Sequence, residues 1–209
     1  MIAKTAQAQQ VIKKSVFIGF VSRTCSEKEA LAFIAAVKQA HPKARHHCYA
    51  FLIGEKDEIQ RQSDNGEPTG TAGVPILEVL KKEQLHNITT VVVRYFGGIK
   101  LGAGGLIRAY SSTTSLAINA ASIIEQIKVV RFFLQIDYSQ LGSVQNYLQK
   151  KQLTPANISY QVKVSLDFWV PEQKVCAIKN ELTDLLNAKL KLQLSTTEFA
   201  EIPYLKEKD

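Results

Sequence analysis

The chain has 209 residues, of which 45% are hydrophobic and 22% are charged, and its formal net charge is +7. This composition is ordinary for a globular protein and excludes disordered and fibrous classes. No apolar stretch approaches the roughly 20 residues that cross a bilayer as a helix. Residues 1–125 hold 15 Lys and Arg against 10 Asp and Glu, whereas the remainder holds 11 against 9. The basic excess therefore lies in the first part and favours an anionic partner there, although positive charge also serves solubility.

Cysteine usage and the first residues indicate the compartment. Cys25, Cys48 and Cys176 are few and widely spaced, which argues against a disulfide framework and against a zinc site of paired thiolates. We interpret all three as small buried hydrophobic residues. Residues 1–14 lack an apolar core and a cleavage site, so they do not form a secretion signal. We expect a cytoplasmic protein with no cofactor, no metal and no membrane association.

The first elements follow from alternation and capping. Residues 11–21 alternate and are rich in β-forming residues, which predicts one strand. Ser26 and Glu29 have the spacing of a helix capping box. Helical periodicity follows until Pro42, where the helix is expected to end. Residues 47–53 return to strand character.

A polar loop is predicted over residues 54–73, because it contains the turn-forming pairs Asn65-Gly66 and Glu67-Pro68. Pro75 suits the first turn of a helix. The apolar run at residues 91–93 is typical of a central strand covered on both faces. A further helix is predicted from about Gly105 to Ala121.

The second half has a different rhythm. Strand signals at residues 127–138, 158–170 and 190–194 alternate with helical patterns that begin at Leu141 and Pro171. A β-α-β-β-α-β order is the ferredoxin-like arrangement, although residues 158–170 give one strand signal where that order needs two. The chain therefore reads as an α+β protein of two domains, residues 1–123 and 124–209.

A cluster of glycines and cations follows the apolar strand. Arg94 precedes Gly97-Gly98, and then come Lys100, Gly102, Gly104, Gly105 and Arg108. Glycine lets backbone N–H groups point outward together, and a helix N-terminus adds partial positive charge. The segment lacks the Gly-Lys-Ser/Thr ending of a phosphate-binding Walker loop. It fits either an anion cradle or tight strand-to-helix packing with solvated cations.

A second cluster combines histidines and carboxylates. His46 stands on a predicted strand, and Asp64 and Glu67 lie in the polar loop. Together with His47, these residues fit either a metal site or acid–base chemistry. They equally fit structural roles, in which Asp64 caps its turn and Glu67 pairs with a basic neighbour. No further histidine is spaced to complete a triad.

Four stretches in a fixed order carry a resemblance to a known family. They are residues 45–50 (RHHCYA), 63–73 (SDNGEPTGTAG), 91–102 (VVVRYFGGIKLG) and 104–110 (GGLIRAY). Together they resemble the signature of the IMPACT family, in its bacterial YigZ-like branch. Two positions depart from the family pattern, which usually has asparagine at His47 and aspartate at Asn65.

The resemblance implies a first domain similar to the second domain of ribosomal protein S5, a fold shared with a domain of elongation factor G. It implies a ferredoxin-like second domain similar to the last domain of that factor. It also implies RNA or ribosome association linked to translation, without an established reaction. Eukaryotic relatives regulate translation through a protein partner, but they lack this second domain.

We therefore expect a non-enzymatic RNA- or ribosome-binding protein that acts on translation. The residues expected to contact phosphate are Lys13, Lys14, Arg45, Arg94, Gly97, Gly98, Lys100, Gly102, Gly104, Gly105 and Arg108. One alternative is an enzyme acting on a small phosphorylated or acidic substrate, with Asp64 or Glu67 as acid or base and His46 as partner. Another is a protein–protein adaptor. The sequence does not indicate the oligomeric state.

Overall fold

The fold was obtained as a computed structural model, which describes residues 1–204. The chain divides into two compact units, residues 1–125 with Pro203 and Tyr204, and residues 126–202. Each unit contains its own sheet and its own apolar core. The prediction of a two-domain α+β protein is therefore confirmed.

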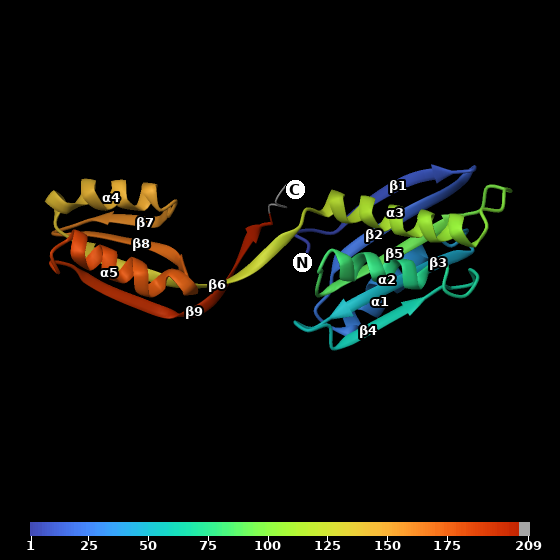
Figure 1. The fold of residues 1–209 in the computed structure, drawn as a ribbon, viewed down its shortest axis with the longest axis horizontal. Coiled ribbons are helices and arrows are strands. Elements are labelled where there is room, and N and C mark those ends of the chain that lie inside the picture. The colour runs from blue at the N-terminus through green and yellow to red at the C-terminus, as the bar shows by residue number, and fades with distance from the viewer. Residues whose placement is uncertain (205–209) are drawn as a thin grey trace. The chain divides into compact units, whose positions relative to one another are not determined.

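The sheet of the first unit has five strands that all pair antiparallel (Figure 1). Their order across the sheet is β1, β2, β5, β3, β4. The strands are β1 (Ala6–Ile12), β2 (Ser15–Arg23), β3 (His46–Ile53), β4 (Ile59–Ser63) and β5 (Ile88–Tyr95). The central position of β5 agrees with the apolar run that predicted it.

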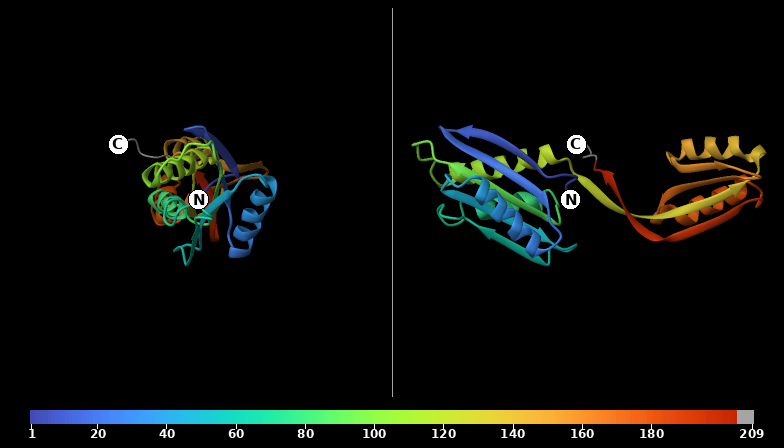
Figure 2. Two further views of the ribbon diagram at one scale, coloured as in Figure 1. Left: turned by 90° about the vertical axis from the view of Figure 1, so that its right-hand side faces the viewer. Right: turned by 180° about the vertical axis from the view of Figure 1, so that it is seen from behind.

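Helices cover both faces of this sheet (Figure 2). On one face, α1 (Glu27–Ala40) packs against Val91 and Val93 of β5. On the other face, α2 (Gly73–Lys82) and α3 (Ala103–Ala121) enclose a larger core that contains Val92. Because successive side chains of a strand point to opposite faces, a doubly covered strand needs an unbroken apolar run.

The predicted cap of α1 is present. Ser26 accepts a hydrogen bond from the backbone N–H of Glu29 at 3.2 Å. The Glu29 carboxylate in turn accepts from the backbone N–H of Cys25 at 2.8 Å. These bonds satisfy N–H groups that the first turn leaves without helical partners. The helix ends at Ala40, before Pro42.

Three predictions were wrong in detail. Residues 11–21 do not form one strand, since Lys13 and Lys14 make a two-residue turn between β1 and β2 with φ of 45° and 65°. The polar loop of residues 54–73 contains β4, an edge strand. Of the three cysteines predicted to be buried, only Cys48 is; Cys25 and Cys176 are exposed.

The second unit has the ferredoxin-like order and topology. Its elements are β6 (Ile124–Ile136), α4 (Leu141–Lys150), β7 (Pro155–Tyr160), β8 (Val164–Pro171), α5 (Val175–Leu185) and β9 (Lys191–Pro203), with short 3-10 turns before α4 and α5. The strand order is β7, β8, β6, β9. Residues 158–170, which gave one strand signal, are a hairpin whose turn leaves Val162 96% exposed. Both helices contribute to one core with the sheet, through Val144 and Leu148 of α4 and Ile178 and Leu182 of α5.

None of the helices within residues 1–204 combines the length and the apolar character needed to cross a bilayer.

Candidate functional site

The strand register gathers the landmark residues at one end of the first sheet. Val16 at the start of β2 pairs with Tyr95 at the end of β5. His46 at the start of β3 pairs with Arg94, and β4 runs back to the same end and finishes at Ser63. We call this region the basic end. It comprises the turn 13–14, the connection 41–45, the loop 64–72 and the loop 96–102.

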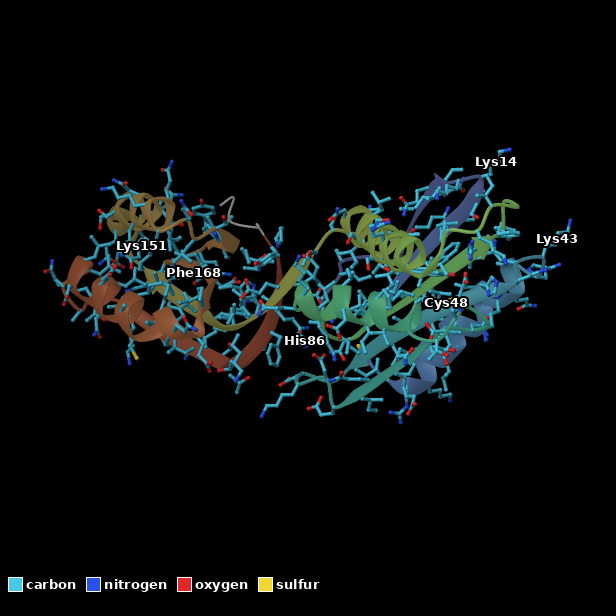
Figure 3. All side chains as sticks on the ribbon, turned by 45° about the vertical axis from the view of Figure 1, so that its right-hand side comes forward. Lys14, Lys43, Cys48, His86, Lys151 and Phe168 are labelled. Carbon is cyan, nitrogen blue, oxygen red and sulfur yellow. The ribbon has the colours of Figure 1, made fainter. Side chains whose placement is uncertain are left out.

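Five exposed cationic side chains project from the basic end: Lys13, Lys14, Lys43, Arg45 and Lys100. None of them has an acidic partner among residues 1–204. Figure 3 shows the amino groups of Lys14 and Lys43 extending away from the ribbon. Because unpaired charges of one sign add their fields, this end attracts anions.

Arg94 does not lie where the sequence led us to expect it. Its Nη1 donates to Oε1 of Glu67 at 2.7 Å, and the two side chains are only 6% and 4% exposed. The guanidinium lies between the rings of Phe17 and Phe96, 5.3 and 5.4 Å from their centroids. Arg94 is therefore not placed to contact phosphate at the surface; it closes a buried ion pair.

A chain of buried groups continues from this ion pair. The hydroxyl of Tyr110 on α3 donates to Glu67 Oε1 at 2.9 Å. Its oxygen lies 3.3 Å from Sγ of Cys48, and Cys48 Sγ is 2.8 Å from the carbonyl oxygen of Asp64. Burial raises the pKa of Cys48 to about 12 and the pKa of Tyr110 well above its ordinary value. Both groups are therefore protonated at neutral pH, and Cys48 is not an activated nucleophile.

The sequence left Asp64 either an acid–base role or a structural role in its loop, and the contacts of its carboxylate are structural. Its Oδ1 accepts from the backbone N–H groups of Ala72 and Gly73, and its Oδ2 accepts from Gly70, all at 2.8–2.9 Å. Burial opposes ionisation, but the three N–H donors outweigh it and hold the pKa of Asp64 below its ordinary value. This carboxylate fixes the loop to the start of α2.

The two histidines of β3 have different surroundings. His46 is half-buried, and its Nδ1 lies 3.2 Å from the carbonyl oxygen of Asn65. His47 is buried, its backbone N–H donates to Asn65 Oδ1 at 2.9 Å, and its Nε2 lies 3.0 Å from the carbonyl oxygen of His41. Burial lowers the pKa of His47. The two family departures, His47 and Asn65, therefore contact each other.

The predicted glycines have distinct roles. Gly97 packs against the β1–β2 turn so closely that an added Cβ would overlap the carbonyl group of Lys14. Gly98 and Gly102 have φ of 84° and 75°, and Gly104 has open space around its Cα. Gly102 begins α3 without a side-chain cap, so the positive end of this helix is presented to solvent beside Lys100.

A groove of about 690 Å³ follows α3 from the basic end. Its lining includes three cationic side chains and three serine hydroxyl groups: Lys13, Lys82, Arg108, Ser111, Ser112 and Ser115. Gly105 and Glu83 also line it. The groove therefore carries three cations against one anion, Glu83, and apart from the serines the rest of its lining, which includes Ile12, Val79, Leu101 and Ile107, is apolar.

The structure thus unites part of the predicted phosphate-binding set. Lys13, Gly105 and Arg108 share the groove, and Lys14, Arg45 and Lys100 lie at the basic end. Sequence reasoning missed Lys43 and Lys82, which stand outside the family motifs. It also missed the serines, whose spacing after Arg108 on one helix was the signal that would have found them.

No group of three or more His, Cys, Asp or Glu side chains within residues 1–204 is arranged to hold a metal ion. The three weak catalytic candidates, His46, Asp64 and Glu67, all lie near one another in the fold. Asp64 and Glu67 are nevertheless engaged, one by backbone N–H groups and the other by Arg94 and Tyr110.

Comparison with protein families matches both units. Residues 13–118 match the Impact N-terminal domain, and residues 134–189 match a domain of unknown function, DUF1949. A solved structure described as that of a hypothetical protein has 34% sequence identity and a TM-score of 0.56, and covers 92% of this chain and 94% of its own.

Two curated relatives align over nearly their whole length. The IMPACT family member YvyE of Bacillus subtilis is 42% identical over 204 residues, which cover 98% of this chain and 92% of that protein. The IMPACT family member YigZ of Escherichia coli is 38% identical over 183 residues, which cover 87% of this chain and 90% of that protein. Both the domain match and these identities lead to one conclusion: the chain belongs to the IMPACT family.

Proposed function

We propose that this protein is a non-enzymatic, cytoplasmic RNA-binding protein that associates with RNA or the ribosome and acts on translation. The observation that carries the proposal is the imbalance of charge at the basic end. Five cations there have no acidic partner among residues 1–204, whereas Glu67 is paired with Arg94 and Asp64 is held by backbone N–H groups. RNA is the polyanion for which such a surface gives sequence-independent affinity.

The groove along α3 is the surface along which we expect the sugar–phosphate backbone of the RNA to lie. Arg108 and Lys13 offer cationic contacts, and the Ser111 hydroxyl offers a neutral hydrogen bond to phosphate or to the 2′-hydroxyl. The hydroxyls of Ser112 and Ser115 already donate to backbone carbonyl oxygens of α3. The uncapped start of α3 adds N–H groups near Lys100. Contacts of this kind fix the position of a strand without reading its sequence.

The enzymatic alternative is not favoured by the geometry. An acid or base must be free to exchange a proton with substrate, but Glu67 is held by Arg94 and Tyr110. Asp64 is held by three backbone N–H groups. A role as a protein–protein adaptor is an outcome that the binding experiment distinguishes.

The test is the affinity for a labelled single-stranded RNA, measured by fluorescence anisotropy over a range of salt concentrations, with sedimentation on ribosomes in parallel. Replacing Lys100 and Arg108 by glutamine should weaken binding to unrelated RNA sequences alike. The slope of log affinity against log salt should become shallower by about 0.7 for each phosphate that the variant no longer neutralises.

The matched control replaces Lys28 and Lys56 by glutamine, which removes the same charge from exposed positions outside the basic end. It should leave affinity and salt slope close to the parent values. If the variant lacking Lys100 and Arg108 bound RNA as tightly as the control lacking Lys28 and Lys56, the basic end would be excluded as the binding surface. Absence of RNA and ribosome binding at low salt would refute the proposal and favour an adaptor.

A further inference from the structure

The second unit has a sheet face that its own helices leave open. Phe132, Leu134 and Leu166 lie in the core between the sheet and the two helices. Alternation therefore turns Phe133 of β6 to the other face, where its side chain is 42% exposed. Large aromatic residues on an uncovered sheet face are a known means of stacking unpaired bases.

Phe133 belongs to a cluster of three planar groups. The Arg131 guanidinium lies 5.1 Å from the centroid of Phe133 and 5.4 Å from that of Trp169. Arg131 pairs with Trp169 across β6 and β8. Its Nε donates to Asp167 Oδ2 at 2.7 Å, which neutralises the charge and fixes the guanidinium plane. The cluster is therefore preorganised, and binding loses little side-chain freedom.

A depression of about 250 Å³ lies beside Phe133. Five of its ten lining residues carry an amide or hydroxyl group, namely Gln135, Asn157, Ser159, Ser165 and Gln193, and the others are Lys191, Asp167 and three apolar side chains. The side chains of Ser159, Gln193 and Lys191 have no hydrogen-bond or ionic partner among residues 1–204. The depression thus offers both donors and acceptors next to an aromatic ring.

The register explains this grouping. Phe133 lies opposite Asp167 on β8, and Asp167 lies opposite Asn157 on β7. One step along, Gln135 and Ser159 both face Ser165. Two adjacent rows across three strands therefore place the ring and the polar side chains on the same face.

We propose that this face binds an unpaired nucleobase of single-stranded RNA. The base stacks on Phe133, beside Arg131 and Trp169, and its edge hydrogen-bonds to the amide side chains of the depression. Amides suit base edges because they carry one donor and one acceptor group in a plane. Lys191 is the cation available for an adjoining phosphate.

This inference rests on the proposed RNA binding and narrows it to unpaired strands. A duplex keeps its bases stacked and its Watson–Crick edges paired, so it cannot use such a site. The amide nitrogens of Gln135 and Asn157 already donate to Ser165 and Asp167. An apolar peptide would stack on Phe133 but would leave the amide of Gln193 and the carbonyl oxygens of the other two amides without partners. The chemistry of the lining therefore favours a base over a peptide.

Trp169 is the sole tryptophan of the chain and reports on its own site. Titration of the full-length protein with a single-stranded RNA 12-mer should quench its emission, while the same RNA as a duplex or inorganic polyphosphate should not. Anisotropy of labelled RNA measures total binding at the same time. Replacing Phe133 by alanine should lower single-strand affinity by about fivefold or more, because one base loses its stacking partner. Replacing it by tyrosine should retain the affinity.

Tyr160→Ala is the matched control, because Tyr160 is more exposed than Phe133 but adjoins Ser159 on β7 and so points to the opposite face. Circular dichroism confirms that each variant is folded. RNA binding without Trp169 quenching, and with unchanged affinity in Phe133→Ala, would overturn the base site and leave the basic end intact. Absence of any RNA binding by the parent protein would overturn both.

Discussion

The guanidinium of Arg94 and the carboxylate of Glu67 meet at 2.7 Å in a place where both side chains are almost wholly buried. Arg94 is the penultimate residue of the central strand, and Glu67 belongs to the loop that precedes α2. The pair therefore ties that loop to the sheet. Tyr110 adds a bond to the same carboxylate oxygen and extends the connection to α3.

Replacing Glu67 by glutamine should lower the free energy of unfolding by about 3 kcal/mol or more, because Arg94 would keep a buried charge without a counterion. Urea denaturation measures the change. Glu27→Gln, which removes an exposed partner of Arg61, should cost at most about 1 kcal/mol. Adding Arg94→Met to Glu67→Gln should recover part of the loss; no recovery would show that the charge is not its cause.

Asp64 should make the protein sensitive to acid. Its pKa is lower when folded than its ordinary value of 3.8, so its contribution to stability is complete above about pH 4. That contribution is lost as pH falls through the lower, folded-state pKa. Asp64→Asn should therefore flatten the decline of stability below pH 4, followed by denaturation at each pH. At neutral pH the variant should lose about 1–3 kcal/mol, because an amide N–H would face a backbone N–H.

The three cysteines should separate by reactivity. Cys25 and Cys176 are exposed, whereas Cys48 is buried and has a pKa raised to about 12. An aromatic disulfide reagent at pH 8 should modify two thiols of the folded chain quickly and the third only after unfolding. Rapid modification of all three would mean that the core around Tyr110 opens readily.

Two glycines of the same motif should respond in opposite directions. In Gly97→Ala the new methyl group meets the backbone of Lys14, so stability should fall by about 1–3 kcal/mol. Gly104 lies inside α3 with open space around it, so Gly104→Ala should raise stability by up to about 1 kcal/mol. Thermal unfolding of the two variants, compared with the parent, tests both signs.

Hydrophobic periodicity predicted the long helices and strands well, because the side chains that pack into the core recur along each element with its own period. The apolar run Val91–Val93 predicted a strand covered on both faces, and the spacing of Ser26 and Glu29 predicted the start of a helix. The β1–β2 hairpin escaped prediction because its turn is Lys13-Lys14, with positive φ but without the glycine or asparagine that usually signals such a turn. The strand β4 escaped because it is a polar edge strand, IQRQS.

The site was harder to predict, because burial of a polar side chain depends on partners distant in sequence. Arg94 stands beside glycines and cations, which suggested a phosphate contact. Its position two residues after Val92 places it on the same sheet face, toward Tyr110. Glu67 is 27 positions away along the chain. The register of β3, β4 and β5 brings Arg94 and the loop of Glu67 to the same end of the sheet, and the packing of α3 on the sheet adds Tyr110.

The central position of β5 also affects how the first unit folds during synthesis. Phe17 of β2 lies opposite Arg94 in the register, so β2 leaves the ribosome long before its neighbour has been synthesised. Until then the nascent chain holds the β1–β2 hairpin, α1, β3, β4 and α2 without the central strand that joins β2 to β3, so the apolar side chains of β2 lack their packing partners. Strand pairings between segments so distant in sequence form slowly, and until they form the chain exposes hydrophobic surface that is prone to aggregation. Synthesis rate and chaperone supply should therefore influence the yield of the first unit.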